Sequence, residues 1–222
     1  MQTKDQRRGL WRTFDQPPAT KDAGYGNMKL ILASSSPRRA EILRDAGIVF
    51  ENFVAQINEA AHPGESAQAM VVRLAEAKAR VAAGQIGSTK GSCIVVGADT
   101  AVELDGEIFG KPRDAVHARE MLAALSGRTH HVLTGIFLVR LPDSATRDAV
   151  ESTAVTFSPM QRSEIETYVA SGEPTDKAGA YAIQGVAGRY ISRIEGCYFN
   201  VVGLPLARLH ALLRELGWSP EK

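Results

Sequence analysis

Apolar residues recur along this chain in two patterns, short uninterrupted runs and helical stripes, and the two patterns alternate. The first clear run is 30–33, which is too short for a helix and is followed by three serines, a proline and two arginines. We interpret it as a strand that leads into a helix with Ser36 as its N-cap and Pro37 in its first position. Gly47 lies where a glycine commonly follows the end of a helix.

The same reading continues to the end of the chain. In the first half it predicts a strand at 49–57, a helix from Ser66 to about Ala83 that stops at Gly84, a strand at 93–98 buried on both faces, and a hairpin at Asp105-Gly106. Next come a helix from Asp114 to near Gly127 and two antiparallel strands at 129–140 and 149–157. In the last part it predicts a helix with a capping box of Ser163 and Glu166, a short strand at 190–194, and a helix with Leu206, Leu209, Leu213 and Leu216 on its apolar face. Strands that alternate with helices predict an α/β fold.

Composition narrows the class of protein. With 222 residues and 44% hydrophobic content, the chain can bury a substantial core. A formal charge of +1 gives no global attraction to nucleic acid or to an anionic membrane. The two cysteines form no disulfide framework, and we find neither an 18-residue apolar span nor a signal peptide, so we expect a cytoplasmic protein. Residues 1–27 are polar and aperiodic, and we interpret them as a disordered extension or a wrongly assigned start.

Two arginines at the start of the first helix are unusual. The first turn of a helix carries partial positive charge, so Arg38 and Arg39 are mildly unfavourable there unless an anion lies in front of them. Backbone N–H groups, serine hydroxyls and two guanidinium groups would together suit a phosphate. The alternative is an ordinary surface helix with two solvated arginines.

Two further charges stand in positions that favour function. Lys78 lies on the apolar side of its helix, four residues after Leu74, where an ammonium group is rarely left without a partner. Asp99 follows the buried strand at 93–98, and open α/β sheets place ligand chemistry at such strand ends. The alternatives are a lysine that snorkels to the protein surface and an aspartate that caps a turn.

The charges together suit a nucleoside triphosphate. Basic groups neutralise the polyphosphate, and carboxylates hold a divalent cation or take a proton from the attacking water. The chain has neither a Gly-x-x-x-x-Gly-Lys-Ser/Thr loop nor a Gly-x-Gly-x-x-Gly motif after a strand, which argues against P-loop enzymes and dinucleotide oxidoreductases. The candidates are the cations Arg38, Arg39, Lys78 and Lys111 and the carboxylates Glu59 and Asp99.

Five ordered motifs resemble those of the Maf family of nucleoside triphosphate pyrophosphatases, first named as septum-formation inhibitors. They are Ala33-Ser34-Ser35-Ser36-Pro37-Arg38-Arg39, Glu76-Ala77-Lys78-Ala79, Gly97-Ala98-Asp99-Thr100, Gly110-Lys111-Pro112, and the run from Asp176-Lys177-Ala178-Gly179-Ala180-Tyr181 to Gln184-Gly185. The resemblance covers a single domain at 29–217. It implies an elongated mixed sheet flanked by helices, with two lobes, a deep cleft, kinship with inosine triphosphate pyrophosphatases and, often, a homodimer.

The resemblance also implies roles for individual residues. Ser34, Arg38 and Arg39 match the triphosphate-binding loop, and Lys78 and Lys111 match lysines of the cleft. Asp99 matches the residue that activates water or helps to hold the metal, Mg²⁺ or Mn²⁺, and Glu59 matches an acid near that metal. Thr100 and Gln184 match positions that recognise the base. Many members have an acidic pair where this chain has Asn58-Glu59, which removes one possible carboxylate near the metal.

The resemblance implies hydrolysis of dTTP and UTP to the monophosphate and pyrophosphate, with modified pyrimidine triphosphates as further candidate substrates. Gly-Ala-Asp-Thr and Ala-Tyr-Ala-Ile-Gln-Gly are similar to the dTTP/UTP group and not to the group that acts on 7-methyl-GTP. One alternative keeps the reaction and changes the base, to another modified or purine nucleotide. Another is a regulator of cell division that senses nucleotides without turnover. With balanced charge and no basic helix, a nucleic-acid binder is the least favoured class.

Overall fold

A computed structural model describes residues 28–87 and 91–219. The prediction that 1–27 form a disordered extension lies outside the described residues. The strands are β1 (Lys29–Ala33), β2 (Glu51–Phe53), β3 (Cys93–Leu104), β4 (Glu107–Phe109), β5 (Thr129–Leu141), β6 (Thr146–Phe157) and β7 (Ile191–Glu195). The helices are α1 (Pro37–Asp45), α2 (Ala67–Ile86), α3 (Ala115–Leu125), α4 (Arg162–Ala170), α5 (Tyr198–Val202) and α6 (Leu206–Glu215), with 3-10 turns η2 (Glu173–Asp176), η3 (Ala178–Ala180) and η4 (Val186–Tyr190).

The strands form one elongated mixed sheet, as the family resemblance implied. Its order is β2-β1-β3-β5-β6-β7, and β4 pairs with β3. The pairs β1–β2 and β1–β3 are parallel, and the other pairs are antiparallel. The expected antiparallel arm is present as β5 and β6, and the Asp105-Gly106 hairpin joins β3 to β4 with positive φ at both residues.

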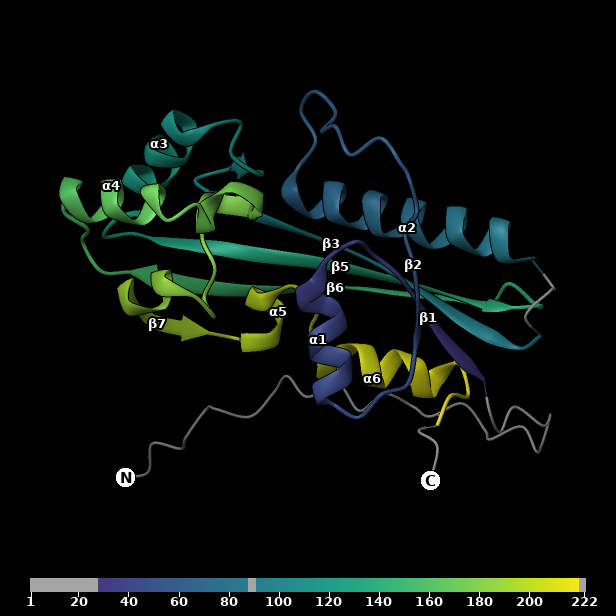
Figure 1. Ribbon diagram of the computed structural model, residues 1–222. Helices are drawn as coiled ribbons and strands as arrows, with labels where there is room; N and C mark the ends of the chain where they lie inside the picture. The colour runs from purple at the N-terminus through teal and green to yellow at the C-terminus, as the bar shows by residue number, and fades with distance from the viewer. Residues whose placement is uncertain (1–27, 88–90, 220–222) are drawn as a thin grey trace, which may run out of the picture.

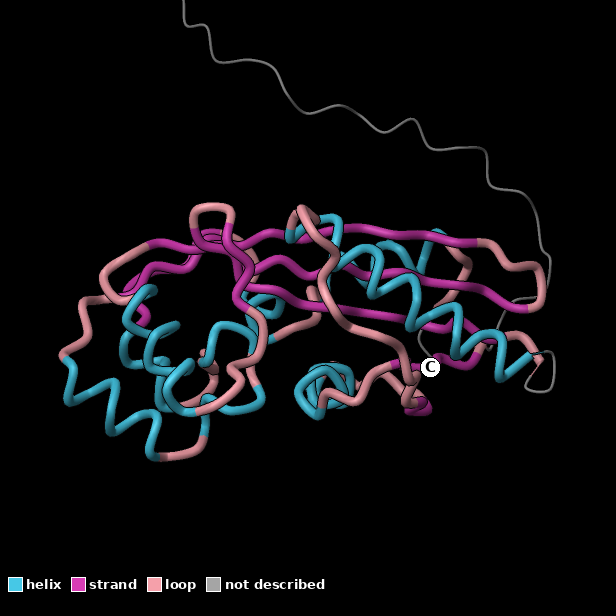
Figure 2. The backbone as a smooth tube through the Cα atoms, turned by 90° about the horizontal axis from the view of Figure 1, so that it is seen from above, coloured by secondary structure: helices cyan, strands magenta, loops and turns pink. Residues whose placement is uncertain are grey.

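Helices cover both faces of the sheet and divide the molecule into two lobes. In Figure 1, α2 lies on one face, α1 and α6 lie on the opposite face, and α3 and α4 gather towards the other end of the long strands. Figure 2 shows α2 running along the strands it covers. One apolar cluster joins α1 and α6 to the sheet, and another joins α3 and α4 to the far halves of β3, β5 and β6. The expected two-lobed α/β architecture is therefore present.

Two glycines allow α2 to lie unusually close to the sheet. A Cβ atom at Gly97 of β3 would lie 2.1 Å from the carbonyl oxygen of Ala75, and one at Gly135 of β5 would lie 2.5 Å from that of Val71. Both carbonyls belong to the backbone of α2, which cannot move aside as a flexible side chain can. These contacts fix the distance between α2 and β3, and hence the distance of Lys78 from β3.

One edge of β3 is left open in its middle. On that edge β1 pairs with β3 only as far as Gly97, and β4 pairs with it only from Val102 onward. The other edge is continuously paired with β5 from Cys93 to Glu103. Among the described strands, no partner therefore covers the open edge between Gly97 and Val102, which is where the two lobes meet.

Four predicted boundaries are corrected by the structure. The strand at 93–98 continues to Leu104, so Asp99 lies inside β3 and not beyond its end. Glycine and aspartate disfavour strands, but the long partner β5 keeps this segment extended. Asp99 is nevertheless just past the last pairing of the parallel neighbour β1. The strand expected at 49–57 is reduced to Glu51–Phe53, because β1 offers only three paired residues there.

The other two corrections concern helix ends. The helix expected to stop at Gly84 continues to Ile86 and ends at Gly87, whose φ is 54°. A glycine inside a helix costs about 1 kcal/mol and does not by itself end it. The expected capping box of Ser163 and Glu166 is wrong. The box lies two residues earlier, with Gln161 as N-cap and its N–H donated to the Glu164 carboxylate at 2.7 Å.

Candidate active site

A pocket opens at the uncovered edge of β3, between the lobes. It is lined by the β1–α1 loop, α2, β3, the loop around Lys111, the segment 176–184 and residues 201–203. Eight of the nine predicted site residues line it. These are Arg38, Arg39, Glu59, Lys78, Asp99, Thr100, Lys111 and Gln184. The ninth, Ser34, is buried directly behind the lining and contacts Arg39.

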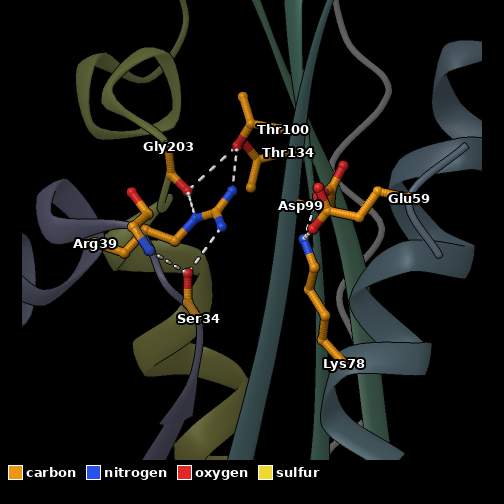
Figure 3. A network of polar contacts seen from close by, with 9 residues as sticks. Ser34, Arg39, Glu59, Lys78, Asp99, Thr100, Thr134 and Gly203 are labelled. Atoms are coloured by element: carbon orange, nitrogen blue, oxygen red, sulfur yellow. Dashed lines mark hydrogen bonds and ion pairs between the residues drawn. The ribbon is translucent and has the colours of Figure 1, made fainter. Parts of the chain in front are cut away.

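Lys78 has the partners that its position on the apolar face of α2 required. Its Nζ atom lies 2.6 Å from Asp99 Oδ1 and 2.6 Å from Glu59 Oε1 (Figure 3). Lys78 is 7% exposed and Asp99 is 9% exposed, while half of the Glu59 side chain faces solvent. The alternative of a lysine snorkelling to the surface is therefore wrong, and so is the alternative of Asp99 as a turn cap, because Asp99 belongs to a strand.

Glu59 is held ionised by this arrangement. Burial alone would raise its pKa, but the hydrogen bond from Lys78 and the charges of Lys78, Lys111 and Arg39 outweigh that effect and lower the pKa below its usual value. Glu59 therefore remains a carboxylate throughout the neutral range. A charged carboxylate is the form that can hold a cation or orient water.

The loop that carries Glu59 is fastened to α2. Arg73 of α2 donates from Nε and Nη2 to the two carboxylate oxygens of Glu65, at 2.6 Å each, and also from Nη2 to the carbonyl oxygen of Ala60. The hydrogen bond from Arg73 lowers the pKa of Glu65 to about 2, so the Arg73–Glu65 ion pair is maintained at all but strongly acidic pH. The helix that positions Lys78 thus also positions Glu59.

Arg38 and Arg39 have different environments. Arg39 is 7% exposed and its guanidinium group is already bonded, from Nε to the carbonyl oxygen of Gly203 at 2.8 Å, from Nη1 to Ser34 Oγ at 3.1 Å and from Nη2 to Thr100 Oγ1 at 2.9 Å (Figure 3). Burial lowers the pKa of Arg39, against the opposing effect of Asp99. Arg38 is only partly buried and lines the pocket. The arginine with more freedom to meet a phosphate is therefore Arg38.

The Arg39 contacts also define the surroundings of Ser34 and Thr100. Ser34 Oγ accepts from the backbone N–H of Ser36 as well as from Arg39, while Ser36 is the N-cap residue without a capping hydrogen bond from its own side chain. Thr100 Oγ1 accepts from Arg39 and lies 2.9 Å from the hydroxyl of Thr134. Because Asp99 and Thr100 are consecutive in a strand, they point to opposite faces of the sheet, and both reach the pocket only because the edge of β3 is open.

The donor set partly fits a divalent cation. Mg²⁺ is commonly bound through one or two carboxylates together with substrate phosphates and water. Asp99 and Glu59 converge from two segments on one point, which provides such a pair of carboxylates. Within the residues that the structure describes, no group of three or more His, Cys, Asp or Glu side chains could hold a metal ion. A cation at Asp99 and Glu59 would therefore depend on oxygens from the substrate.

Three lining residues were not singled out as site residues by the sequence reasoning. Asp176, Lys177 and Tyr181 belong to the quoted family motif, and all three line the pocket. Lys177 donates to Asp176 Oδ1 at 2.6 Å and to the carbonyl oxygen of Glu173 at 2.8 Å. The hydrogen bond from Lys177, with a smaller contribution from Arg38, lowers the pKa of Asp176. The signal that could have identified them is the motif itself, which places a charged pair beside the small residues.

The fold and the pocket define an α/β protein with a cationic, carboxylate-containing site between two lobes. The family model described as "Maf-like protein" matches residues 29–216. A dTTP/UTP pyrophosphatase of Anaeromyxobacter sp. (strain Fw109-5) is 53% identical over 192 residues, 85% of this chain and 90% of that protein. Proteins of the same name from Symbiobacterium thermophilum and Escherichia coli (strain K12) are each 49% identical, over 86% and 87% of this chain and 95% of their own length.

This chain therefore belongs to the Maf family. Among solved structures, a nucleoside triphosphatase from Mycobacterium abscessus, described as a dITP/XTP pyrophosphatase, matches with a TM-score of 0.36 and 19% identity. The match covers 60% of this chain and 76% of that one. No described helix is long and apolar enough to cross a membrane.

Proposed function

We propose that this protein is a nucleoside triphosphate pyrophosphatase that hydrolyses dTTP and UTP to the monophosphate and pyrophosphate. The observation that carries the proposal is the ion group of Lys78, Asp99 and Glu59 facing a cationic pocket. The names of relatives at about half identity support the choice of substrate. A hydrolase of anhydride bonds requires such a combination, since negative charge on the phosphates must be neutralised while water is activated.

In this proposal the cations bind and orient the triphosphate. Arg38 and Lys111 face the pocket and contact the phosphates. Arg39 also lines the pocket, but its guanidinium group is bonded to Ser34, Thr100 and Gly203, so it contributes mainly its positive charge. Water attacks the α phosphorus, the bond from that phosphorus to the bridging oxygen breaks, and pyrophosphate leaves with the bonding electron pair. The growing charge on the leaving group is stabilised by the same cations.

Asp99 is the residue proposed to receive the proton from the attacking water. Its ion pair with Lys78 fixes the carboxylate in one orientation. Asp99 and Glu59 would also hold Mg²⁺ or Mn²⁺. That ion, when bound, neutralises phosphate charge and lowers the pKa of bound water. Lys78 then has two roles, as the partner that orders both carboxylates and as a cation beside the phosphates.

We assign base selection chiefly to Gln184. Gln184 is exposed and lines the pocket, so its amide can both donate to and accept from the edge of a pyrimidine. Thr100 is engaged with Arg39 and Thr134, so its contribution to base recognition would be indirect. The cytoplasm as location, a homodimer as assembly and independence from nucleic acids remain predictions.

The proposal is tested with a panel of dTTP, UTP, CTP, GTP, ATP and 7-methyl-GTP. Pyrophosphate and orthophosphate are assayed separately, with Mg²⁺, with Mn²⁺ and with a chelator. We expect pyrophosphate from dTTP and UTP, no product with the chelator, and a Gln184→Ala variant whose kcat/KM falls by roughly tenfold for dTTP and UTP but less for GTP.

Other outcomes identify the alternatives. Pyrophosphate released fastest from a purine or modified nucleotide would move the assignment to another base. Binding of nucleotides without any product would favour a nucleotide-sensing regulator of cell division over an enzyme.

A further inference from the structure

Gln184, the proposed base reader, lies in a tight turn. The N–H of Gly185 donates to the carbonyl oxygen of Ala182 at 3.1 Å, which makes Ile183 and Gln184 the two central residues. We refer to residues 182–185 as the 182–185 turn. A glutamine on a surface turn can read a base only if the turn is held in place, because side-chain amides select by hydrogen-bond geometry.

The backbone before and after Gln184 is bound by the side chains of Tyr168 and Glu173. The N–H of Ala182 donates to the hydroxyl oxygen of Tyr168 at 3.3 Å, and the N–H of Val186 donates to Glu173 Oε2 at 3.1 Å. Tyr168 in turn donates its hydroxyl hydrogen to Glu173 Oε1 at 2.9 Å. The backbone on each side of Gln184 is thus tied to the same linked pair.

The pair is well fixed in the fold. Tyr168 is 1% exposed and packs in the apolar cluster of the α3–α4 lobe. Its burial, and then its hydrogen bond to Glu173, raise the pKa of the phenol, so the hydroxyl keeps the proton that it donates. Glu173 begins η2, and its main-chain carbonyl accepts from Lys177.

The contact between the pair and the turn leaves no spare room. A Cβ atom at Gly185 would lie 2.1 Å from Glu173 Oε1. The turn therefore lies directly on the carboxylate, and a larger residue at position 185 would push the Glu173 side chain aside. Neither Tyr168 nor Glu173 is among the described residues that line the pocket, so they act on the substrate only through the turn.

We propose that Tyr168 and Glu173 are positioning residues that fix Gln184 for base selection. The inference rests on the proposed function, because it concerns the base-reading end of that same pocket. Loosening the turn should weaken recognition of the pyrimidine and leave the chemistry at the phosphates largely intact, since Asp99 and Lys78 lie on other elements.

The test uses the full chain with Tyr168→Phe and Glu173→Ala as disrupting variants. Glu173→Gln is the conservative variant, because its amide oxygen can accept from Val186 and its NH₂ group can donate to the hydroxyl of Tyr168. Tyr198→Phe and Glu120→Ala are matched controls at exposed positions outside the described pocket lining. Calorimetry measures Kd for non-hydrolysable analogues of dTTP and GTP, and steady-state assays measure KM and kcat for dTTP.

We expect both disrupting variants to raise Kd and KM for the dTTP species by roughly tenfold, to change kcat by less than about threefold, and to reduce the preference for dTTP over GTP by the same factor as Kd. Glu173→Gln should stay within about threefold of the wild type. Hydrogen exchange of the amides of Ala182 and Val186 should accelerate in the disrupting variants only.

Unchanged base preference in folded Tyr168→Phe and Glu173→Ala proteins would overturn the inference, as would equal weakening for both analogues, which indicates a merely structural role. A Glu173→Gln protein as impaired as Glu173→Ala would also overturn it, because the amide oxygen can keep the hydrogen bond from Val186 that holds the turn. Because binding is measured without turnover, a wild type that binds the dTTP analogue but releases no product would refute the proposed reaction and still decide this inference. A wild type that binds neither analogue would refute both.

Discussion

The single charge that most constrains this site is the ammonium group of Lys78. It is almost fully buried, and it is paired with two carboxylates at 2.6 Å each. Removing one partner of such a buried pair typically costs about 3–5 kcal/mol, because the remaining charge is left without compensation. Because Lys78 has two carboxylate partners, the loss of either Glu59 or Asp99 alone still leaves its ammonium group paired.

A second buried titratable residue makes stability depend on pH. His130 is fully buried, its Nε2 atom lies 2.8 Å from the hydroxyl of Tyr181, and its ring packs edge-on against Phe157 and Tyr181. Burial, with a smaller effect of His131, lowers its pKa to about 4. In the unfolded chain the pKa is about 6.5, so between these values the unfolded state binds more protons and stability falls as the pH falls.

At pH 5 this effect should remove about 2 kcal/mol of the stability that the wild type has at pH 7.5. Urea unfolding at the two pH values measures it. His130→Gln should lose correspondingly less than the wild type between those values, while His131→Gln, which removes only the smaller contribution to the shift, should lose nearly as much as the wild type. Equal losses in wild type and His130→Gln would show that His130 does not carry the effect.

At the scale of elements, the site depends on how close α2 lies to the sheet. Lys78 is next to Ala79, whose backbone N atom would be 2.7 Å from a Cβ atom placed on Gly97. Gly97 is two residues before Asp99 in β3. The glycine thus sets the separation of the two elements at the point where their ion pair forms.

Gly97→Ala should therefore force α2 outward and separate Lys78 from Asp99. We expect a loss of about 2–3 kcal/mol in the free energy of unfolding and a fall in kcat of about a hundredfold. The control is Gly84→Ala in the same helix, where a Cβ atom meets nothing within 4 Å. It should gain about 0.5–1 kcal/mol and keep full activity. Thermal melts and initial rates measure both, and a Gly97→Ala protein with wild-type melting and rate would contradict the packing argument.

The elements also show what the sequence can and cannot predict. Lys78 could be recognised as a candidate site residue because a lysine on an apolar stripe needs a partner. Its partners, Asp99 and Glu59, are 21 and 19 residues away in sequence, and their contacts with Lys78 depend on the packing of α2 on β3. Asp99 was placed at a strand end because local propensity says nothing about a partner strand as long as β5. The sequence predicts Arg39 as a phosphate ligand, but it does not show that Gly203 and Thr100 also bind its guanidinium group.

At the scale of the whole molecule, the pocket exists because two strands share one edge of β3 and leave a gap between them. β1 ends at Gly97 and β4 begins at Val102, so Asp99 and Thr100 are exposed to the space between the lobes. The strand–helix pattern sufficed to predict an α/β protein, and the family resemblance supplied the mixed sheet and two lobes. The gap itself is a property of register, which no single segment encodes.

The central claim is that this pocket cleaves dTTP at the α phosphorus with Asp99 as the key carboxylate. The most direct measurement follows pyrophosphate, orthophosphate and dTMP from dTTP with the wild type and Asp99→Asn side by side, together with their melting curves. We predict one pyrophosphate per dTMP and no early orthophosphate for the wild type, and a rate at least about a hundredfold lower for a folded Asp99→Asn protein. Orthophosphate as the first product, or near-normal turnover by folded Asp99→Asn, would contradict the account.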